Sequence, residues 1–199
     1  MTEVALRPIE RVASTTLPTK YGIFQMHVYV DAEGKEHVAL TVGDVGDGQA
    51  ALARIHSECL TGDVFGSQRC DCGEQLEQSL ASLQAEGRGV LIYLRQEGRG
   101  IGLTNKIRAY ALQDGGLDTV DANRALGLPD DPRDYRPAAE ILRDLGVAAV
   151  TLITNNPRKI DGLAAHGVRV VGRRAALVAP NRHNGPYLAA KRARMGHLL

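Results

Sequence analysis

Three cysteines, Cys59, Cys70 and Cys72, lie close together in the sequence, across a loop with glycines that let the chain turn. Three thiolates can hold a zinc ion and leave its fourth tetrahedral position to water, which is typical of catalytic rather than structural zinc. Free cysteines are often simple core residues. However, the last two flank Asp71 and follow Arg69, so they do not continue an apolar period. The spacing therefore favours a metal site.

The run of residues 54–58 leads directly into Cys59 and offers a cation, a proton carrier and a carboxylate. Such groups suit a substrate site beside a metal, because polar neighbours orient metal ligands and tune them. The same run also suits a polar strand end in contact with water, and the sequence leaves both readings open. His56 is the nearest candidate for a fourth ligand, which would close the site and make it structural.

Two further segments contain residues suited to bind phosphate. The glycine-rich loop at residues 97–102 precedes an expected helix, where free backbone amides can meet an anion. It lacks the Gly-Lys-Ser/Thr of a P-loop and the spacing of a dinucleotide motif. Residues 154–159 form a strand-to-helix turn in which Lys159 can contact phosphate. An ordinary helix cap with a solvated basic turn is the alternative there.

Three more residues are ambiguous when taken alone. Tyr110 follows Leu103 by seven residues on the helix face of Ile107, so core packing and function are equally compatible with it. Asp131 and Arg133 lie in a loop rich in Pro and Asp, and that composition favours a solvated turn.

Short strands alternate with helices around these segments. Residues 23–30 and 37–42, joined by a turn at 31–34, predict an antiparallel hairpin. Helical periodicity follows Gly73, and helices are expected at 103–113, near 119, up to 146, after Pro157 and from Pro186. Strands are expected at 89–94, 148–154 and 168–171. This order predicts an α/β fold: a single domain over residues 1–199, with a mixed sheet, antiparallel N-terminal strands and flanking helices.

The composition excludes several classes of protein. The 199-residue chain has 24 Lys and Arg against 23 Asp and Glu and only 4% aromatic residues, which argues against nucleic-acid binding. Its longest uncharged apolar stretch, residues 147–154, is far shorter than the roughly 20 residues of a membrane helix. An odd cysteine count without a signal-peptide pattern favours the cytoplasm. The basic residues Lys191, Arg192 and Arg194 predict a solvated helix face.

Together these motifs strongly resemble GTP cyclohydrolase II, the first enzyme of riboflavin biosynthesis. The matching segments are residues 54–63, 69–73, 95–103, 105–114, 154–157 and 191–199. The resemblance covers essentially the whole chain. This length leaves no room for the dihydroxybutanone phosphate synthase domain fused in some relatives, so the monofunctional form is expected.

The resemblance implies a role for each matching residue. Cys59, Cys70 and Cys72 correspond to the ligands of one zinc ion per chain. Asp131 corresponds to a proton acceptor, Arg133 to a nucleophile and Tyr110 to a tyrosine beside the base. The residues that correspond to GTP contacts are Arg54, Ile55, His56, Ser57, Glu58, Gln75, Glu97, Gly98, Arg99, Thr119, Thr154 and Lys159. The resemblance also implies GTP as substrate, Mg²⁺ on its triphosphate and a homodimer.

The implied reaction is zinc-dependent hydrolysis of GTP. Zinc lowers the pKa of its bound water, so that hydroxide can open the imidazole ring at C8. Formate and pyrophosphate are released, leaving 2,5-diamino-6-hydroxy-4-(5-phosphoribosylamino)pyrimidine. Arg133 is an awkward nucleophile, because the pKa of a guanidinium lies above about 12. Stabilisation of charge during transfer to water is the alternative role.

Two other functions compete with this interpretation. A zinc-dependent nucleobase or nucleoside deaminase shares the metal and the His-x-Glu pattern, which His56 and Glu58 imitate. Its Cys-x-x-Cys half is missing, because only Asp71 separates Cys70 from Cys72. The second alternative is a non-catalytic structural zinc module, which would need a closed site with four ligands.

Overall fold

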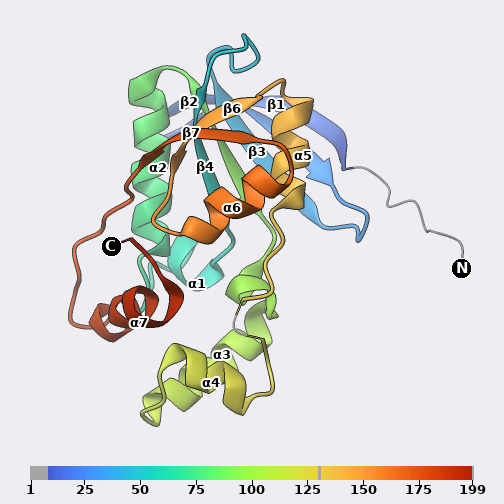
Figure 1. Ribbon diagram of the computed structural model, residues 1–199. Coiled ribbons are helices and arrows are strands. Elements are labelled where there is room, and N and C mark those ends of the chain that lie inside the picture. The colour runs from blue at the N-terminus through green and yellow to red at the C-terminus, as the bar shows by residue number, and fades with distance from the viewer. Residues whose placement is uncertain (1–8, 130, 199) are drawn as a thin grey trace, which may run out of the picture.

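One mixed sheet of seven strands organises the molecule, with strand order β1-β2-β3-β5-β4-β6-β7 (Figure 1). The computed structural model describes residues 9–129 and 131–198. Strands β1 (Glu10–Thr19), β2 (Gly22–Val30) and β3 (Glu36–Val42) are antiparallel, and β3 is antiparallel to β5 (Gly89–Leu94). Strands β5, β4 (Ala51–Ser57), β6 (Ala149–Ile153) and β7 (Arg169–Arg174) are parallel. The predicted hairpin and fold class are confirmed.

Helices cover both faces of the parallel half. Helix α2 (Cys72–Glu86) packs on one face, where Leu83 joins Leu52 and Phe24 in an apolar cluster. Helices α5 (Arg136–Asp144) and α6 (Pro157–Ala165) cover the other face, whose larger cluster includes Ile55. Because successive side chains of a strand point to opposite faces, Arg54 and His56 of β4 lie on the same face as Leu52, towards α2.

The remaining helices gather at one end of the sheet (Figure 1). They are α1 (Leu60–Asp63), the 3-10 turn η1 (Glu97–Gly100), α3 (Gly102–Asp114), α4 (Thr119–Ala125) and α7 (Gly185–Met195). Strand β7 continues to Arg174, past the predicted end at residue 171. No helix in the described ranges is both long and apolar enough to span a membrane. The predicted domain also includes residues 1–8, 130 and 199, which lie outside the described residues.

Candidate active site

The polar motifs meet at the carboxyl ends of the parallel strands. Strands β4, β5 and β6 end at Ser57, Leu94 and Ile153, and each is followed directly by one of the predicted segments. Parallel strands bring these ends to one edge of the sheet, where α/β proteins bind ligands. A cavity that is partly open to solvent lies at this edge and is also lined by residues of α3, α4 and α7.

Nearly all predicted site residues line this cavity. They are Arg54, His56, Ser57, Glu58, Cys59, Cys70, Cys72, Gln75, Glu97, Gly98, Arg99, Tyr110, Thr119, Arg133, Thr154 and Lys159. Segments that are distant in sequence therefore form one site.

Ile55 and Asp131 are placed differently. The side chain of Ile55 is fully buried in the core, and its backbone oxygen accepts a hydrogen bond from Lys159 Nζ at 2.6 Å. Asp131 accepts hydrogen bonds from Nε and Nη2 of Arg133, both at 2.7 Å. Burial alone would raise the pKa of Asp131, but Arg133 outweighs burial and holds that pKa below its ordinary value. Neither residue lines the cavity, but each accepts a hydrogen bond from a side chain that does, Lys159 or Arg133.

The three cysteine sulfurs form a cluster on the cavity wall. All three Sγ atoms lie within 4.8 Å of one another, and those of Cys59 and Cys70 are 3.7 Å apart. Tetrahedral zinc with Zn–S bonds of about 2.3 Å requires sulfurs about 3.8 Å apart. A Cβ atom on Gly62 would lie 2.8 Å from Cys70 Sγ, so the backbone leaves room for sulfur only because residue 62 is glycine. The donors and their spacing fit zinc.

A close approach of two helices positions the cysteines. Cys59 caps α1, and Cys72 is the first residue of α2. A Cβ atom on Gly73 would lie 2.4 Å from the backbone oxygen of Gly62, so α1 and α2 meet through two glycines. The cysteine spacing therefore follows from the packing of two helix starts.

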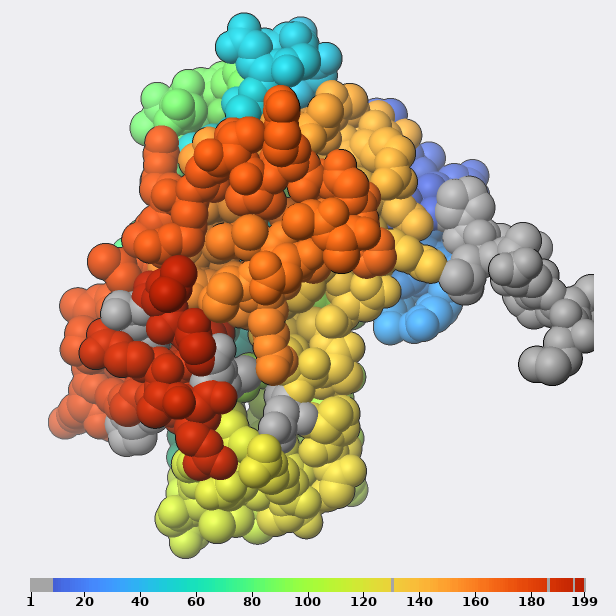
Figure 2. All heavy atoms as spheres, in the orientation of Figure 1, coloured from blue at the N-terminus to red at the C-terminus, as the bar shows by residue number. Residues whose placement is uncertain are grey.

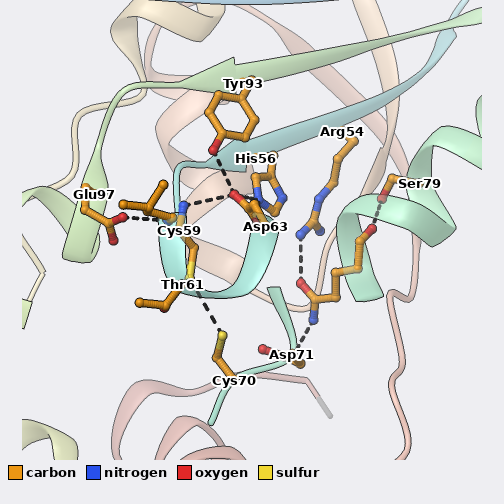
Figure 3. Close-up of polar contacts among 12 residues, drawn as sticks. Arg54, His56, Cys59, Thr61, Asp63, Cys70, Asp71, Ser79, Tyr93 and Glu97 are labelled. Atoms are coloured by element: carbon orange, nitrogen blue, oxygen red, sulfur yellow. Dashed lines mark hydrogen bonds and ion pairs between the residues drawn. The ribbon is translucent and has the colours of Figure 1, made fainter. Parts of the chain in front are cut away.

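Asp63 connects the cysteine loop to the sheet, a role that the sequence analysis missed (Figure 3). Its carboxylate lies 3.0 Å from His56 Nε2 and accepts hydrogen bonds from the Cys59 amide at 2.9 Å and Tyr93 Oη at 2.8 Å. Burial, only partly offset by Asp63, lowers the pKa of His56, which favours the neutral ring. His56 Nε2 contacts Asp63, so His56 ties the cysteine loop to β4. The closely spaced metal-binding side chains that the described residues gather are the three cysteines, without His56.

Lys106 is a second residue that the sequence analysis missed. Its Nζ atom donates to Cys59 Sγ at 3.1 Å and to Glu97 Oε1 at 2.8 Å. The other carboxylate oxygen of Glu97 accepts the Leu60 amide at 2.7 Å. Lys106 thus joins the cysteine loop to the glycine-rich loop. Its ammonium group also favours the thiolate form of Cys59, whose pKa is lowered first by hydrogen bonds from the other two cysteines.

The glycine-rich loop has an unusual backbone. Gly98 and Arg99 have φ values of 61° and 62°, and Arg99 is the one non-glycine residue with positive φ in the described part of the chain. Such a conformation is strained for a residue with a side chain and persists where the surroundings enforce it. The turn directs Arg99 to the cavity wall.

A line of buried polar contacts crosses the site from β4 to α7. Arg54 donates to Gln75 Oε1 at 2.7 Å, and Gln75 donates to Asp71 Oδ2 at 2.6 Å. Lys191 Nζ donates to the other Asp71 oxygen at 2.6 Å. The predicted solvated face is therefore wrong for Lys191, which is 7% exposed, whereas Arg192 and Arg194 are exposed.

Comparisons with known proteins show the family of this chain. The family model described as GTP cyclohydrolase II matches residues 10–175. The chain belongs to the GTP cyclohydrolase II family. Proteins named GTP cyclohydrolase-2 from Neisseria meningitidis serogroup A, Hahella chejuensis and Pseudomonas paraeruginosa are 58%, 57% and 57% identical to it. Each match covers 94% of this chain, and 95%, 91% and 92% of the respective relative.

Among solved structures, a two-domain 3,4-dihydroxy-2-butanone 4-phosphate synthase from A. baumannii matches with a TM-score of 0.45 and 20% identity. The match covers 86% of this chain and 41% of that one. The predicted family and its enzyme class, a hydrolase, are confirmed by the sequence relatives and do not depend on this structure.

Within this GTP cyclohydrolase II family member, Tyr110 is part of the cavity and not of the core. Leu103 and Ile107, its expected core neighbours, are 38% and 48% exposed. The Tyr110 ring instead lies beside the Arg69 guanidinium, 4.9 Å from the ring centroid, and lines the cavity. The core-packing alternative for Tyr110 is therefore wrong.

Proposed function

We propose that this protein hydrolyses GTP, opening the guanine imidazole ring and releasing formate and pyrophosphate. The observation that carries the proposal is one cavity lined both by the three cysteines and by several cationic side chains. The three cysteines form a cluster in the lining, and Arg99, Arg133 and Lys159 line the same space. A purine nucleotide whose base faces the sulfurs and whose phosphates face the cations satisfies both.

The overall reaction consumes three waters. The first attacks C8, and the C8–N9 bond breaks to leave a formamide on N7. The second breaks the C8–N7 bond and frees formate. The third takes the α-phosphoryl group as the bond to the β-phosphate breaks, which releases pyrophosphate. Atoms balance without an oxidant or reductant, so no redox cofactor is needed.

We assign the zinc ion to Cys59, Cys70 and Cys72. When bound, zinc supplies hydroxide at neutral pH by lowering the pKa of a water molecule. Lys106 balances the negative charge of the thiolates through its contact with Cys59 Sγ. Tyr110 contributes an aromatic wall for the base, and Glu58 offers a carboxylate acceptor for guanine N–H groups.

The phosphate wall is built around Arg133. Burial alone would lower the pKa of Arg133, but the hydrogen bonds from its guanidinium to Asp131 hold that pKa above the ordinary value. Arg133 therefore stays protonated, which supports charge stabilisation during phosphoryl transfer to water over nucleophilic attack. Thr154 and Lys159 bind the same phosphates, and Mg²⁺ neutralises part of the triphosphate charge.

The site gives less support to the two competing functions. A deaminase of the His-x-Glu type uses histidine on the metal, but His56 is not among the closely spaced metal-binding side chains that the described residues gather. A closed structural module needs four ligands, and the described residues gather three.

We also propose a cytoplasmic homodimer. The edge strand β1 is mostly exposed, and Val12 of β1 and Ile23 of the neighbouring strand β2 expose 51% and 62% of their surface. Long exposed edge strands favour pairing with another chain. Sedimentation analysis of the purified protein tests this state directly, and a monomer at micromolar concentration would contradict it.

One incubation tests the proposed reaction. Zinc-loaded protein is mixed with GTP and Mg²⁺, and formate, pyrophosphate and the pyrimidine product are quantified. We expect equal amounts of formate and pyrimidine, and no formate from protein stripped of metal. Nucleotide turnover without formate, or full activity in metal-free protein, would refute the proposal.

A further inference from the structure

The C-terminal strap, residues 184–198, lies beyond the segment matched by the family model and is tied to the site at three places. Lys191 binds Asp71 between two of the cysteines, and Arg194 forms ion pairs with Asp118 and Asp121 of the α4 region. The Leu198 amide donates to the Asn155 backbone oxygen at 2.8 Å, at the end of β6. Figure 2 shows the red C-terminal atoms packed against the yellow-green helices.

A glycine turn brings the end of the strap back to the cavity. Gly196 has φ of 66°, the left-handed cap conformation that ends helices and favours glycine. The His197 amide then donates to the Lys191 backbone oxygen at 3.1 Å, and the His197 ring lines the cavity. Its Nε2 atom is buried without a hydrogen-bond partner among the described residues. A buried polar atom without a partner is costly, so a ligand atom at this point would stabilise the site.

The charges around this atom indicate which ligand fits. Burial, together with the cations Lys191, Arg99, Arg133 and Lys159, lowers the pKa of His197 to about 3, so its ring is neutral. Burial and the charges of Arg54, Arg133 and Lys191 also lower the pKa of Lys159. These cations repel one another, and a multivalent anion among them would relieve the repulsion.

Lys191 can contact such an anion without leaving Asp71. Its ammonium group has three N–H donors. One is used by Asp71 Oδ1 at 2.6 Å, and the group also lies 4.4 Å from the centre of the Tyr187 ring. Lys191 lines the cavity, so a further donor can reach a phosphate oxygen.

We propose that the C-terminal strap completes the polyphosphate-binding part of the site, with Lys191 and His197 donating hydrogen bonds to phosphate oxygens of the nucleotide and of released pyrophosphate. This inference rests on the proposed use of a nucleoside triphosphate. It differs from a purely structural role, in which Lys191 only positions Asp71 and the cysteine loop.

Calorimetric titration of the zinc-loaded protein separates the two roles. Magnesium pyrophosphate and guanosine are titrated into the wild type, Lys191→Met, His197→Ala and the control Arg192→Met, an exposed position on the same helix. We expect pyrophosphate affinity to fall about 10–100-fold in Lys191→Met and about 3–10-fold in His197→Ala. Guanosine affinity and zinc content should not change, and Arg192→Met should stay within about twofold of wild type.

Two results would overturn the proposal. One is a pyrophosphate affinity equal to that of the wild type in both single variants, His197→Ala and Lys191→Met. The other is a Lys191→Met protein that loses zinc and guanosine binding as strongly as pyrophosphate binding, since that pattern marks a structural tie through Asp71. Should Lys191→Met not fold, the His197→Ala titration decides alone. Pyrophosphate binding needs no turnover. A wild-type protein that binds pyrophosphate but releases no formate would therefore refute the proposed reaction and leave the proposed role of the strap intact.

Discussion

The antiparallel and parallel halves of the sheet differ in whether their buried polar side chains have hydrogen-bond partners. In the antiparallel half, the buried His37 is satisfied on both sides, by Asp31 at 3.1 Å and by the Arg95 amide at 3.1 Å. At the carboxyl ends of the parallel strands, Arg54 Nε, His56 Nδ1 and Asn156 Nδ2 are buried without partners among the described residues. All three residues line the cavity.

This difference shows which half the protein uses for binding. Native proteins satisfy nearly all buried polar groups, so unsatisfied atoms of several residues that line one cavity favour a ligand there. The antiparallel strands complete a scaffold, and in their vicinity Tyr21 Oη is the one such atom that the described residues show. We therefore expect substitutions in the parallel half to change chemistry, and those in the antiparallel half to change stability alone.

Removing a sulfur should have the largest effect. We expect Cys70→Ser to abolish zinc retention and formate release, because two thiolates cannot hold the metal as three do. The chain should remain folded, since the sheet and its two apolar clusters lie elsewhere. Metal analysis, a formate assay and circular dichroism check this. Full formate release by a Cys70→Ser protein shown to lack metal would contradict the catalytic zinc.

The next largest effect is expected at Arg133. If it stabilises charge, Arg133→Lys should keep a measurable rate of pyrophosphate release and lose about 10–100-fold, because the two-point geometry of guanidinium is lost. Arg133→Ala should lose more. Rapid quenching with GTP labelled at the α-phosphate gives the decisive measurement. A guanylyl adduct trapped on Arg133 would show that this residue is a nucleophile.

Asp63 and Asp31 form a matched pair across the two halves, because each carboxylate binds a buried histidine. We expect Asp63→Asn to weaken zinc affinity and activity by about 10–100-fold, as is usual for groups that orient metal ligands. Asp31→Asn should leave both unchanged. Competition with a chelator measures the affinity. Equal effects in the two variants would remove the functional distinction between the halves.

The smallest effect on activity is expected in the antiparallel half. Phe24 is 1% exposed and packs with Leu52 and Leu83. Phe24→Ala should lower the free energy of unfolding by about 3–5 kcal/mol through the cavity it leaves. The activity per folded molecule should stay the same. Thermal unfolding and steady-state kinetics well below the transition test both parts, and a large fall in kcat under those conditions would contradict the comparison.

The sequence predicts those site residues that belong to contiguous sequence motifs. Residues after β4, β5 and β6 could be placed because strand ends converge in a parallel sheet. Asp63 could not, because its role depends on the four-residue helix α1 folding its carboxylate back onto His56. Lys191 could not either, since a basic run resembles a solvated face until tertiary packing buries one member of it.

The order in which the chain is synthesised gives the contact between Asp71 and Lys191 a further consequence. The cysteines lie between residues 59 and 72, whereas Lys191 joins Asp71 across 120 positions of sequence. During translation, the three sulfurs therefore leave the ribosome together, and Lys191 emerges well after them. A nascent or prematurely ended chain would carry its metal ligands beside a nucleotide pocket that lacks one wall.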